Sequence, residues 1–550
     1  MKEQKATQGG EFLLTEPAAI FSPESFSEQQ RLIAETAERF AQEEIAPAGE
    51  KIEQKDFATV RGLLRRAGEL GLTGVEVPED YGGLGLDFTA SAIVADHLAI
   101  QGSFSVAFGA HAGIATLPLV FFGNDEQKRC YLPRLASSEW VGAYALSEAG
   151  SGSDALAMRT QAEREGGGGF RLNGEKMWIS NAGFADLFTV FAKVDGKATA
   201  FLVEAATAGV STGAEEHKMG IHGSSTRPLL LRDARIAEAN VLGGVGEGAH
   251  IAFQILNVGR FKLGAACIGG GRNCLREAIQ YARERQAFGK SIAEFGLIRE
   301  HIARMATGLF AAESAVYRTV GLMDHIHRLD EFAMECSMVK VHASEILDDL
   351  VDRAVQIHGG NGFVHGNLAE AAYRDARVNR IFEGTNEINR MLLTGMALRR
   401  AQKGELPLRE AVEGVIAEVM GPAQTHSPAE QARRATLLVA GLAVRRFGEA
   451  IEHEQVVLAA LADLMIAVYV LQAVAARQPD ALMTQVLASR LLDEVDVRAR
   501  YALATISSGD ELRTQAAWVR RLLKRDLANV AAWEQQIAAR VIEAGRYLVV

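Results

Sequence analysis

The 550-residue sequence has few of the residues that mark secreted, metal-binding or nucleic-acid-binding proteins. Its four cysteines, Cys130, Cys267, Cys274 and Cys336, match no paired metal-ligand spacing, which indicates a reducing compartment. The net charge of -11 argues against a surface that binds nucleic acid. A polyanionic ligand would therefore need local arginines rather than a general positive field.

A cleavable targeting segment is not evident at the start of the chain. No secretory signal is visible, and the acidic Glu3 comes too early for a mitochondrial transit peptide, so we expect a cytoplasmic protein. Residues 98–124 contain no Lys, Arg, Asp or Glu and are long enough for a membrane span. They also contain Gln101, Pro118 and several glycines, and this composition favours a pair of buried helices over a membrane span.

Length and pattern predict several domains rather than a single core. Residues 1–28 are polar and irregular and are expected to form a surface arm. Helical spacing over residues 29–140 gives way to alternating short segments with turn residues over 141–248, which indicates an antiparallel β domain. Helices return over residues 249–403, and a further helical region is expected over 404–550 after a short linker.

Hydrophobic periodicity locates the individual helices. The first is expected to start at Ser27, and a second to end at Gly71. In the last region we expect helices over residues 428–451, 455–476, 481–507 and 514–542. The residues expected near one face of the first helix are Leu32, Ile33, Ala37, Phe40 and Ile45.

The most informative stretch is Arg380–Ile388, in which Glu383 lies between an apolar pair and Gly384. Desolvation raises the pKa of such a carboxylate and makes it a candidate general base. Gly384 permits a turn or a close ligand approach, and Thr385 and Asn386 offer hydrogen bonds. Taken alone, a Glu-Gly-Thr turn is more often a helix junction, so the catalytic interpretation needs further support.

A glycine-dense stretch upstream supplies that support. Residues 356–363 read Gln-Ile-His-Gly-Gly-Asn-Gly-Phe, and backbone amides in such a turn can approach an anionic or dinucleotide ligand. Together the two stretches resemble the C-terminal signature of the acyl-CoA dehydrogenase family. In that family the glutamate at the position of Glu383 removes the α-proton of an acyl-CoA thioester, and flavin N5 of FAD accepts the β-hydride.

The resemblance continues towards the N-terminus. Residues 72–87 match the family's N-terminal helical domain in the order of their glycines, Pro78 and Tyr81. Small residues crowd the stretch 107–115, which is consistent either with close helix packing or with one boundary of an acyl tunnel. The stretch Gly142–Asp154 resembles the family's first flavin-contact motif, although alanine 149 replaces the usual proline.

The resemblance also implies roles for individual residues. Trp178 and Ser180 would border the flavin ring, and Arg285 would contact the FAD pyrophosphate, often across a dimer interface. Arg285 could equally be a solvated charge at a helix end. Gly259 occupies the place where some members carry their base, which leaves Glu383 as the base candidate. The expected cofactor contacts are Tyr144, Leu146, Ser147, Ser153, Trp178, Ile179, Ser180, Arg285, Phe288, Gln356, Gly359, Gly360, Thr385, Asn386 and Glu387, and the expected substrate contacts are Ser153, Arg260 and Gly384.

The region after residue 400 resembles the very-long-chain branch of the family, because ordinary short-chain relatives end near that point. In that branch a segment just after the catalytic domain contributes to membrane attachment. Here the corresponding residues 404–427 are short and acidic, so a peripheral membrane contact stays open. The implied fold is a multi-domain α+β fold with an N-terminal helical domain, a middle antiparallel β domain, a four-helix-bundle-like C-terminal domain and an extra C-terminal helical domain.

The implied activity is the FAD-dependent α,β-dehydrogenation of long-chain acyl-CoA thioesters to trans-2-enoyl-CoA in fatty-acid β-oxidation. An electron-transfer flavoprotein would be the acceptor, and the protein would be a homodimer. An acyl-CoA oxidase or a short-chain dehydrogenase is an alternative that peroxide production and chain-length preference would separate. A second alternative is an assembly or scaffold protein that keeps the fold and only weak catalysis.

Overall fold

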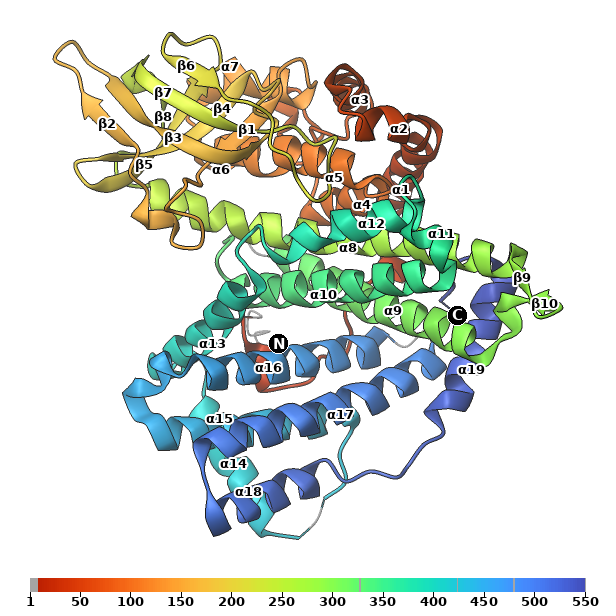
Figure 1. Ribbon diagram of the computed structural model, residues 1–550. Helices are drawn as coiled ribbons and strands as arrows, with labels where there is room; N and C mark the ends of the chain where they lie inside the picture. The colour runs from red at the N-terminus through yellow and green to blue at the C-terminus, as the bar shows by residue number, and fades with distance from the viewer. Residues whose placement is uncertain (1–7, 326–327, 423, 478–479, 550) are drawn as a thin grey trace. The chain divides into compact units, whose positions relative to one another are not determined.

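The structure is a computed structural model that describes residues 8–325, 328–422, 424–477 and 480–549 (Figure 1). The chain divides into two compact units, which we treat separately. The sheet unit comprises Phe26–Gly270 and Arg374–Asn379. The helical unit comprises the described residues of Met1–Ser25, Gly271–Tyr373 and Arg380–Val550.

Helices begin the sheet unit. Ser27 starts α1 (Glu28–Phe40) as predicted, because its hydroxyl accepts a hydrogen bond from the Gln30 backbone N–H at 3.2 Å and the Gln30 side chain accepts one from the Ser27 N–H. Leu32 is 57% exposed and does not join the buried face formed by Ala37 and Phe40. The α- and π-helices that follow before the sheet are the π-helical η3 (Ala41–Ile45), α2 (Gly49–Glu53), α3 (Phe57–Glu69), α4 (Phe88–Leu98), α5 (Gly102–Phe108), the π-helical η6 (Gly109–Ala115), α6 (Leu117–Phe122) and α7 (Asp125–Ala136).

Within the described residues, three helical stretches are long and apolar enough to cross a membrane by length and composition alone. They are Gly102–Phe122, Gly248–Glu284 and Gln455–Arg477. Most of the 18 most apolar consecutive residues of each stretch are buried inside the protein: 67% in the first, 72% in the second and 83% in the third. The first stretch lies within the uncharged residues 98–124, and its burial agrees with the interpretation of that segment as buried helices.

The sheet is mixed rather than purely antiparallel. Its strands run in the order β6-β7-β3-β2-β4-β5-β8, with β1 beside β4. The pairs β1–β4 and β2–β4 are parallel, and the other pairs are antiparallel. The strands are β1 (Gly142–Ala145), β2 (Gln161–Arg164), β3 (Phe170–Ser180), β4 (Leu187–Val194), β5 (Lys197–Glu204), β6 (Val210–Thr212), β7 (Thr226–Ile236) and β8 (Val241–Leu242).

A bundle of long helices forms the centre of the helical unit (Figure 1). Helix α10 (Ala333–His358) packs against α9 (Gly296–Asp324) and α13 (Asn386–Gln402). The C-terminal part of α8 (Gly248–Glu284) joins them, since a Cβ at Gly271 would lie 2.8 Å from Leu350 of α10. These helices confirm the predicted bundle-like domain, and with the sheet and the added helices they confirm the predicted fold class. Shorter elements of this unit are β9 (Gln286–Ala287), β10 (Lys290–Ser291), α11 (Gly360–Phe363) and α12 (Leu368–Ala376), whose last residues belong to the sheet unit.

The C-terminal extension shares a core with this bundle. Helix α16 (Gln455–Arg477) packs against both α9 and α13, and it lies beside α15 and α17. The single helix expected over residues 514–542 is wrong, because two helices separated by residues 523–529 occupy this stretch. The second of them starts where the Asn529 side chain accepts a hydrogen bond from the Ala532 N–H. The other α-helices of the extension are α14 (Leu408–Met420), which lies within the acidic residues 404–427, α15 (Pro428–Phe447), α17 (Ala481–Ile506), α18 (Gly509–Leu522) and α19 (Val530–Ala544).

The N-terminal arm is part of the helical unit's core, so the prediction of a surface arm was wrong for its central residues. Phe12 and Leu13 are only 3% and 2% exposed. The Gln472 side chain of α16 donates to the Phe12 carbonyl at 2.9 Å, and Arg433 of α15 donates to the Leu13 carbonyl at 3.1 Å. Two apolar side chains within a polar stretch are enough to anchor it when helices from the far end of the chain supply the partners.

Candidate functional site

The Glu383 loop connects η10 (Arg377–Arg380) to α13 and has an unusual backbone. Glu383 has φ +57° and Gly384 has φ +80°, so two consecutive residues adopt the left-handed conformation. Glycine adopts it without strain, whereas a glutamate adopts it only where the surroundings enforce it. The Glu383 side chain is partly buried, and its Oε2 atom is shielded from solvent.

Buried polar groups hold this loop in place. Lys340 of α10 is fully buried, and its Nζ donates to the Gly384 carbonyl at 2.8 Å and to the Asn386 Oδ1 at 2.7 Å. Asn389 of α13 also donates to the Gly384 carbonyl, at 2.8 Å. Thr385 caps α13 by accepting from the Ile388 N–H at 3.2 Å. The residue after the candidate base is therefore clamped from two helices, which limits how far the Glu383 carboxylate can move.

Of the remaining predicted contacts in this loop, Asn386 is buried and Glu387 is exposed. The Asn386 amide also donates to Ser344 and Glu345 of α10, so its role is to join two helices. The pKa of Glu387 is lowered, chiefly because its carboxylate accepts from its own backbone N–H at the start of α13.

The predicted glycine-dense turn lies at the C-terminal end of α10. Gly359 ends the helix with φ +58°, and a Cβ placed on Gly359 or Gly360 would meet no atom within 4 Å. The backbone is therefore open to a ligand on this side, and Gln356 is exposed nearby. The His358 ring stacks on Tyr281 of α8 at 4.3 Å, which ties the turn to the end of α8.

The hairpin after α8 carries Arg285 and Phe288, which are both exposed. Phe288 is 95% exposed and has φ +52°, in the tight turn between β9 and β10. An almost fully exposed phenylalanine with a left-handed backbone is an unfavourable placement in an isolated chain. It is typical of a surface that a ligand or another subunit covers.

In the sheet unit, Trp178 stands in a bulge of β3. Pairing with β7 shifts register between Lys176 and Ile179, and Trp178 has φ +57° and is 56% exposed. Ser180 ends the strand and is partly buried, while the Ile179 side chain packs into the sheet core. The bulge thus turns the Trp178 indole out of the sheet, where a flat ligand can stack on it.

A buried ion pair anchors the predicted flavin-contact loop to β3. Lys176 Nζ donates to Glu148 Oε1 at 2.7 Å and to the Leu146 carbonyl at 3.1 Å, and the Met177 N–H donates to the Ser147 carbonyl. Burial alone would raise the pKa of Glu148, but the bonds from Lys176, Thr160 and the Arg159 N–H outweigh it and lower the pKa. The carboxylate therefore stays ionised and the loop stays attached to β3.

The other predicted residues of this unit differ in burial. Tyr144 of β1 is buried and its ring packs against Phe191 at 5.0 Å. Ser153 is exposed in the loop after β1. Arg260 of α8 is only 4% exposed and donates to the Asn257 Oδ1 at 2.8 Å. The bonds of Lys176 and its neighbour on β3 therefore hold the loop residues Leu146 and Ser147 beside the strand that carries Trp178.

Comparison with known proteins identifies this arrangement. Family models match residues 27–139, 143–234 and 246–397 as the acyl-CoA dehydrogenase N-terminal, middle and C-terminal domains, and a further C-terminal domain model of that family matches 431–521. The chain is 42% identical over the full length of both chains to a probable acyl-CoA dehydrogenase of Bacillus subtilis. The chain belongs to the acyl-CoA dehydrogenase family.

Two further relatives of this acyl-CoA dehydrogenase are informative. The crystal structure of an acyl-CoA dehydrogenase complexed with FAD from Bacillus anthracis superposes with a TM-score of 0.96 and 43% identity, over 99% of this chain and 100% of that one. The human very long-chain specific mitochondrial acyl-CoA dehydrogenase is 39% identical over 66% of this chain and 56% of its own length.

The protein is an FAD-dependent enzyme of this family, and its residues fit the cofactor. In the sheet unit the exposed ring of Trp178 offers a flat apolar surface to a ligand ring, and in the helical unit the exposed ring of Phe288 offers another. The open backbone at Gly359 and Gly360 leaves space for a ligand to approach main-chain N–H groups. Arg285 supplies an exposed guanidinium suited to a pyrophosphate.

Sequence reasoning missed the two buried lysines that position these site residues. Lys340 clamps the carbonyl next to Glu383, and Lys176 anchors the loop that contains Ser147. A signal was present at Lys340, because it is the only lysine or arginine among the apolar and small residues of 333–344. Lysines are seldom fully buried without partners, so a lysine within an apolar helical stretch indicates a specific polar contact.

Proposed function

We propose that this acyl-CoA dehydrogenase oxidises long-chain acyl-CoA thioesters to trans-2-enoyl-CoA, with Glu383 as the general base that removes the α-proton. The observation that carries the proposal is the clamped left-handed loop at Glu383 and Gly384. A base that must meet one carbon atom benefits from a fixed backbone, since a small misplacement lowers the rate steeply. Partial burial of the carboxylate limits its solvation and favours proton abstraction.

FAD, when bound, supplies the two-electron acceptor for the β-hydrogen. The chain's own part is to hold the thioester against Glu383, exclude water and keep the carboxylate able to accept a proton. Developing negative charge on the thioester oxygen needs a hydrogen-bond donor, and we assign the Glu383 backbone N–H to this role from the family resemblance.

A long-chain preference is supported by two observations. The chain shares its main domains with the very long-chain specific human relative and also carries an extra C-terminal domain matched by a family model. In η6, which contains most of the cluster of small residues 107–115, a Cβ at Gly109 would meet no atom within 4 Å, so space remains beside the helix. Ala107 and Ala112 are buried against neighbours, so close packing accounts for part of the cluster and open space for another part.

We further propose a homodimer in which each subunit contributes to its partner's FAD site. The Glu383 loop contacts Lys340, whereas the open turn follows His358 at the end of the same helix. At 1.5 Å per residue, the 18 residue steps of α10 from Lys340 to His358 span roughly 27 Å. This separation within one chain supports a site completed by Arg285 and the Gly359 turn of a second subunit. An electron-transfer flavoprotein is proposed as the acceptor.

The test is Glu383→Gln, which keeps the side-chain shape and removes the base. We expect the variant to retain FAD and to bind acyl-CoA, with flavin reduction slowed by at least ~10²-fold. The assay mixes oxygen-free protein with acyl-CoAs of graded chain length and follows bleaching of the flavin absorbance. Glu413→Gln, the same change at an exposed position of α14, serves as the control.

Three results would contradict parts of the proposal. Near-normal flavin reduction by Glu383→Gln would place the base elsewhere. Faster bleaching with short chains than with long ones would remove the long-chain preference. Peroxide release in air at a rate close to turnover would favour the oxidase alternative.

A further inference from the structure

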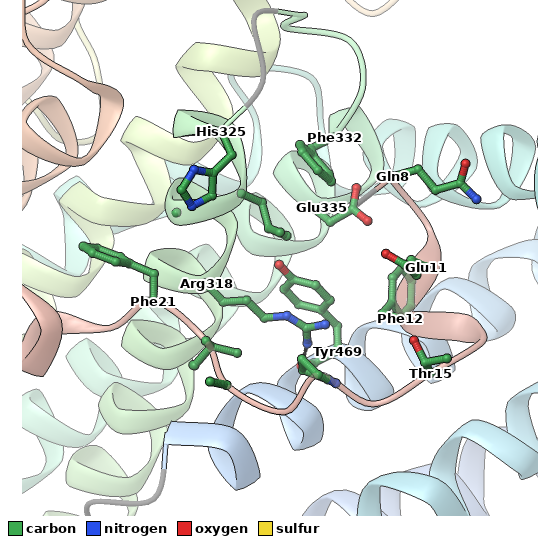
Figure 2. A pocket seen from close by; sticks show the side chains of 15 residues that line it. Gln8, Glu11, Phe12, Thr15, Phe21, Arg318, His325, Phe332, Glu335 and Tyr469 are labelled. Atoms are coloured by element: carbon green, nitrogen blue, oxygen red, sulfur yellow. Dashed lines mark hydrogen bonds between the residues drawn. The ribbon is translucent and has the colours of Figure 1, made fainter. Parts of the chain in front are cut away.

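A cavity of about 340 Å³ lies beneath the N-terminal arm, within the helical unit. Figure 2 shows the arm crossing one side of it, with side chains of α9, α10 and α16 facing inward. We call it the arm pocket. Its volume lies at the lower end of the range typical of small-molecule sites, about 300–1,000 Å³. None of the residues assigned above to the FAD and acyl-CoA sites lines it.

The arm pocket contains a buried guanidinium. Arg318 of α9 is 7% exposed, and it donates to the Tyr469 carbonyl at 2.9 Å and to the Gln472 Oε1 at 3.2 Å. Its guanidinium also lies over the Tyr469 ring at 3.9 Å. These two bonds use two of the five N–H donors of an arginine, and neither partner carries a full negative charge. A buried cation of this kind attracts an anion.

A buried carboxyl group lines the same pocket. Glu335 of α10 is 2% exposed, and its Oε1 accepts from the Gly10 N–H of the arm at 2.7 Å. Its Oε2 is shielded from solvent and has no hydrogen-bond partner among the residues that the structure describes. Leaving such an atom unsatisfied is costly, so a ligand group that bonds to it would be stabilising.

Two cations on neighbouring helices act on Glu335. Burial raises its pKa to about 7, while the Gly10 N–H and the cations Arg400 of α13 and Arg318 of α9 oppose that rise. Tyr469 of α16 also lines the pocket and stays neutral, because burial raises the pKa of its phenol and its hydroxyl bonds to Thr319. The remaining titratable groups of the lining are Glu11 on the arm and His325 at the end of α9.

The other walls are largely apolar and aromatic. Phe12 packs edge-to-face on Tyr469 at 5.4 Å, and Phe332 is 1% exposed at the start of α10. Phe21 lies against Gly321 of α9, where a Cβ would come within 2.3 Å of the Phe21 Cβ. A ligand here would place an apolar body among these rings and a polar group towards Arg318 and Glu335.

We propose that the arm pocket binds a small organic carboxylate, whose oxygens accept from the Arg318 guanidinium and from a protonated Glu335. An amine would meet the buried Arg318 cation and is disfavoured by charge repulsion. A neutral amide would leave Arg318 without an anionic partner. The carboxylate binds the form of Glu335 that carries a proton, so binding takes up protons near neutral pH.

The ligand would also hold the arm in place. Gly10 is bonded to Glu335, the Gly9 carbonyl accepts from Arg400, and the Phe12 carbonyl accepts from Gln472. A molecule that contacts Glu335 from inside the cavity therefore stabilises the docked arm as well as its own site.

The test uses benzoate as the probe and isothermal titration calorimetry on the FAD-loaded, full-length protein. We expect one site with millimolar or tighter affinity, and an affinity about tenfold weaker near pH 8 than near pH 6, because Glu335 loses its proton between them. Benzamide, the neutral isostere, should bind much more weakly. Titration in two buffers of different ionisation enthalpy should show proton uptake at about pH 8.

Three variants locate the site. Glu335→Gln keeps a donor at every pH, so benzoate binding should persist and lose its pH dependence. Arg318→Gln should weaken binding by about tenfold or more, as expected when the charged partner of a buried pair is removed. Leu322→Trp fills the cavity from α9 and leaves Arg318 and Glu335 unaltered, so it should abolish benzoate binding.

Several outcomes would overturn the proposal. No heat at millimolar benzoate would do so, as would benzamide binding as tightly as benzoate. A benzoate affinity that neither Arg318→Gln nor Leu322→Trp changes would place the probe elsewhere, for example in the acyl-CoA site. If Arg318→Gln fails to fold, the Leu322→Trp and Glu335→Gln results still decide. Binding of wild type that does not change with pH would exclude the role of Glu335.

Discussion

Lys340→Met tests whether the clamp on the Glu383 loop is needed for catalysis. Methionine has a similar length and no charge, so the change removes the donors while keeping most of the buried volume. It deletes the bonds from Nζ to the Gly384 carbonyl and to the Asn386 Oδ1. The Gly384 carbonyl keeps its bond from Asn389, so the loop loses one of its two clamps rather than both.

The magnitude follows from these contacts. A hydrogen bond from a charged donor contributes about 1.5–3 kcal/mol, so losing two of them, with one acceptor still satisfied, should cost about 3 kcal/mol. A protein of this kind has about 5–15 kcal/mol of stability, so the variant should fold. The loop, however, would sample other positions, and a displacement of about 1 Å at a reacting group can lower a rate ~10²-fold.

The assay is anaerobic stopped-flow reduction of the flavin by a long-chain acyl-CoA, with FAD content measured from the absorbance ratio. We expect normal FAD content and a reduction rate between those of wild type and Glu383→Gln. Lys403→Met, the same substitution at the exposed end of α13, is the matched control. Wild-type reduction by folded Lys340→Met would refute the reasoning, because the clamp would then be dispensable for positioning Glu383.

Three further predictions concern assembly and pH. Arg285→Ala should weaken FAD retention and make it depend on protein concentration, and full retention by a monomer would contradict a site shared between subunits. Removing residues 405–550 should cause aggregation or altered assembly, because α16 packs on α9 and α13 and contains buried apolar residues such as Val457 and Leu464. Light scattering measures this, and it should show the intact protein as a dimer; a stable tetramer would contradict the prediction. Glu335→Gln should raise the melting temperature at pH 8 but not below pH 4.5. Burial raises the pKa of Glu335 from 4.5 to about 7, so the contribution of Glu335 to the free energy of unfolding is fully present below pH 4.5 and is lost as the pH rises through 7. This loss is on the order of 3 kcal/mol. An equal change in melting temperature at both pH values would contradict the titration of Glu335.

The sequence by itself determined the features that depend on a few neighbouring residues. Ser27 and Gln30 cap α1 because both groups lie within one turn. Gly384 takes a left-handed backbone because glycine alone does so without strain, and the Glu-Gly-Thr order locates the start of α13. The domain order and the candidate base followed from such local motifs and from the family resemblance that they carry.

Tertiary structure decided what depends on residues far apart in the chain. Lys340 and Gly384 are separated by 44 positions, and no local pattern links a lysine in one helix to a carbonyl before another. Gly10 and Glu335 are 325 positions apart, and their bond places the arm over the pocket that a surface arm would have left uncovered. Periodicity reports which face of an element is apolar, but which element covers that face depends on long-range packing. The free energy that selects these partners comes from burial and hydrogen bonding across the whole unit, so only the folded chain reveals them.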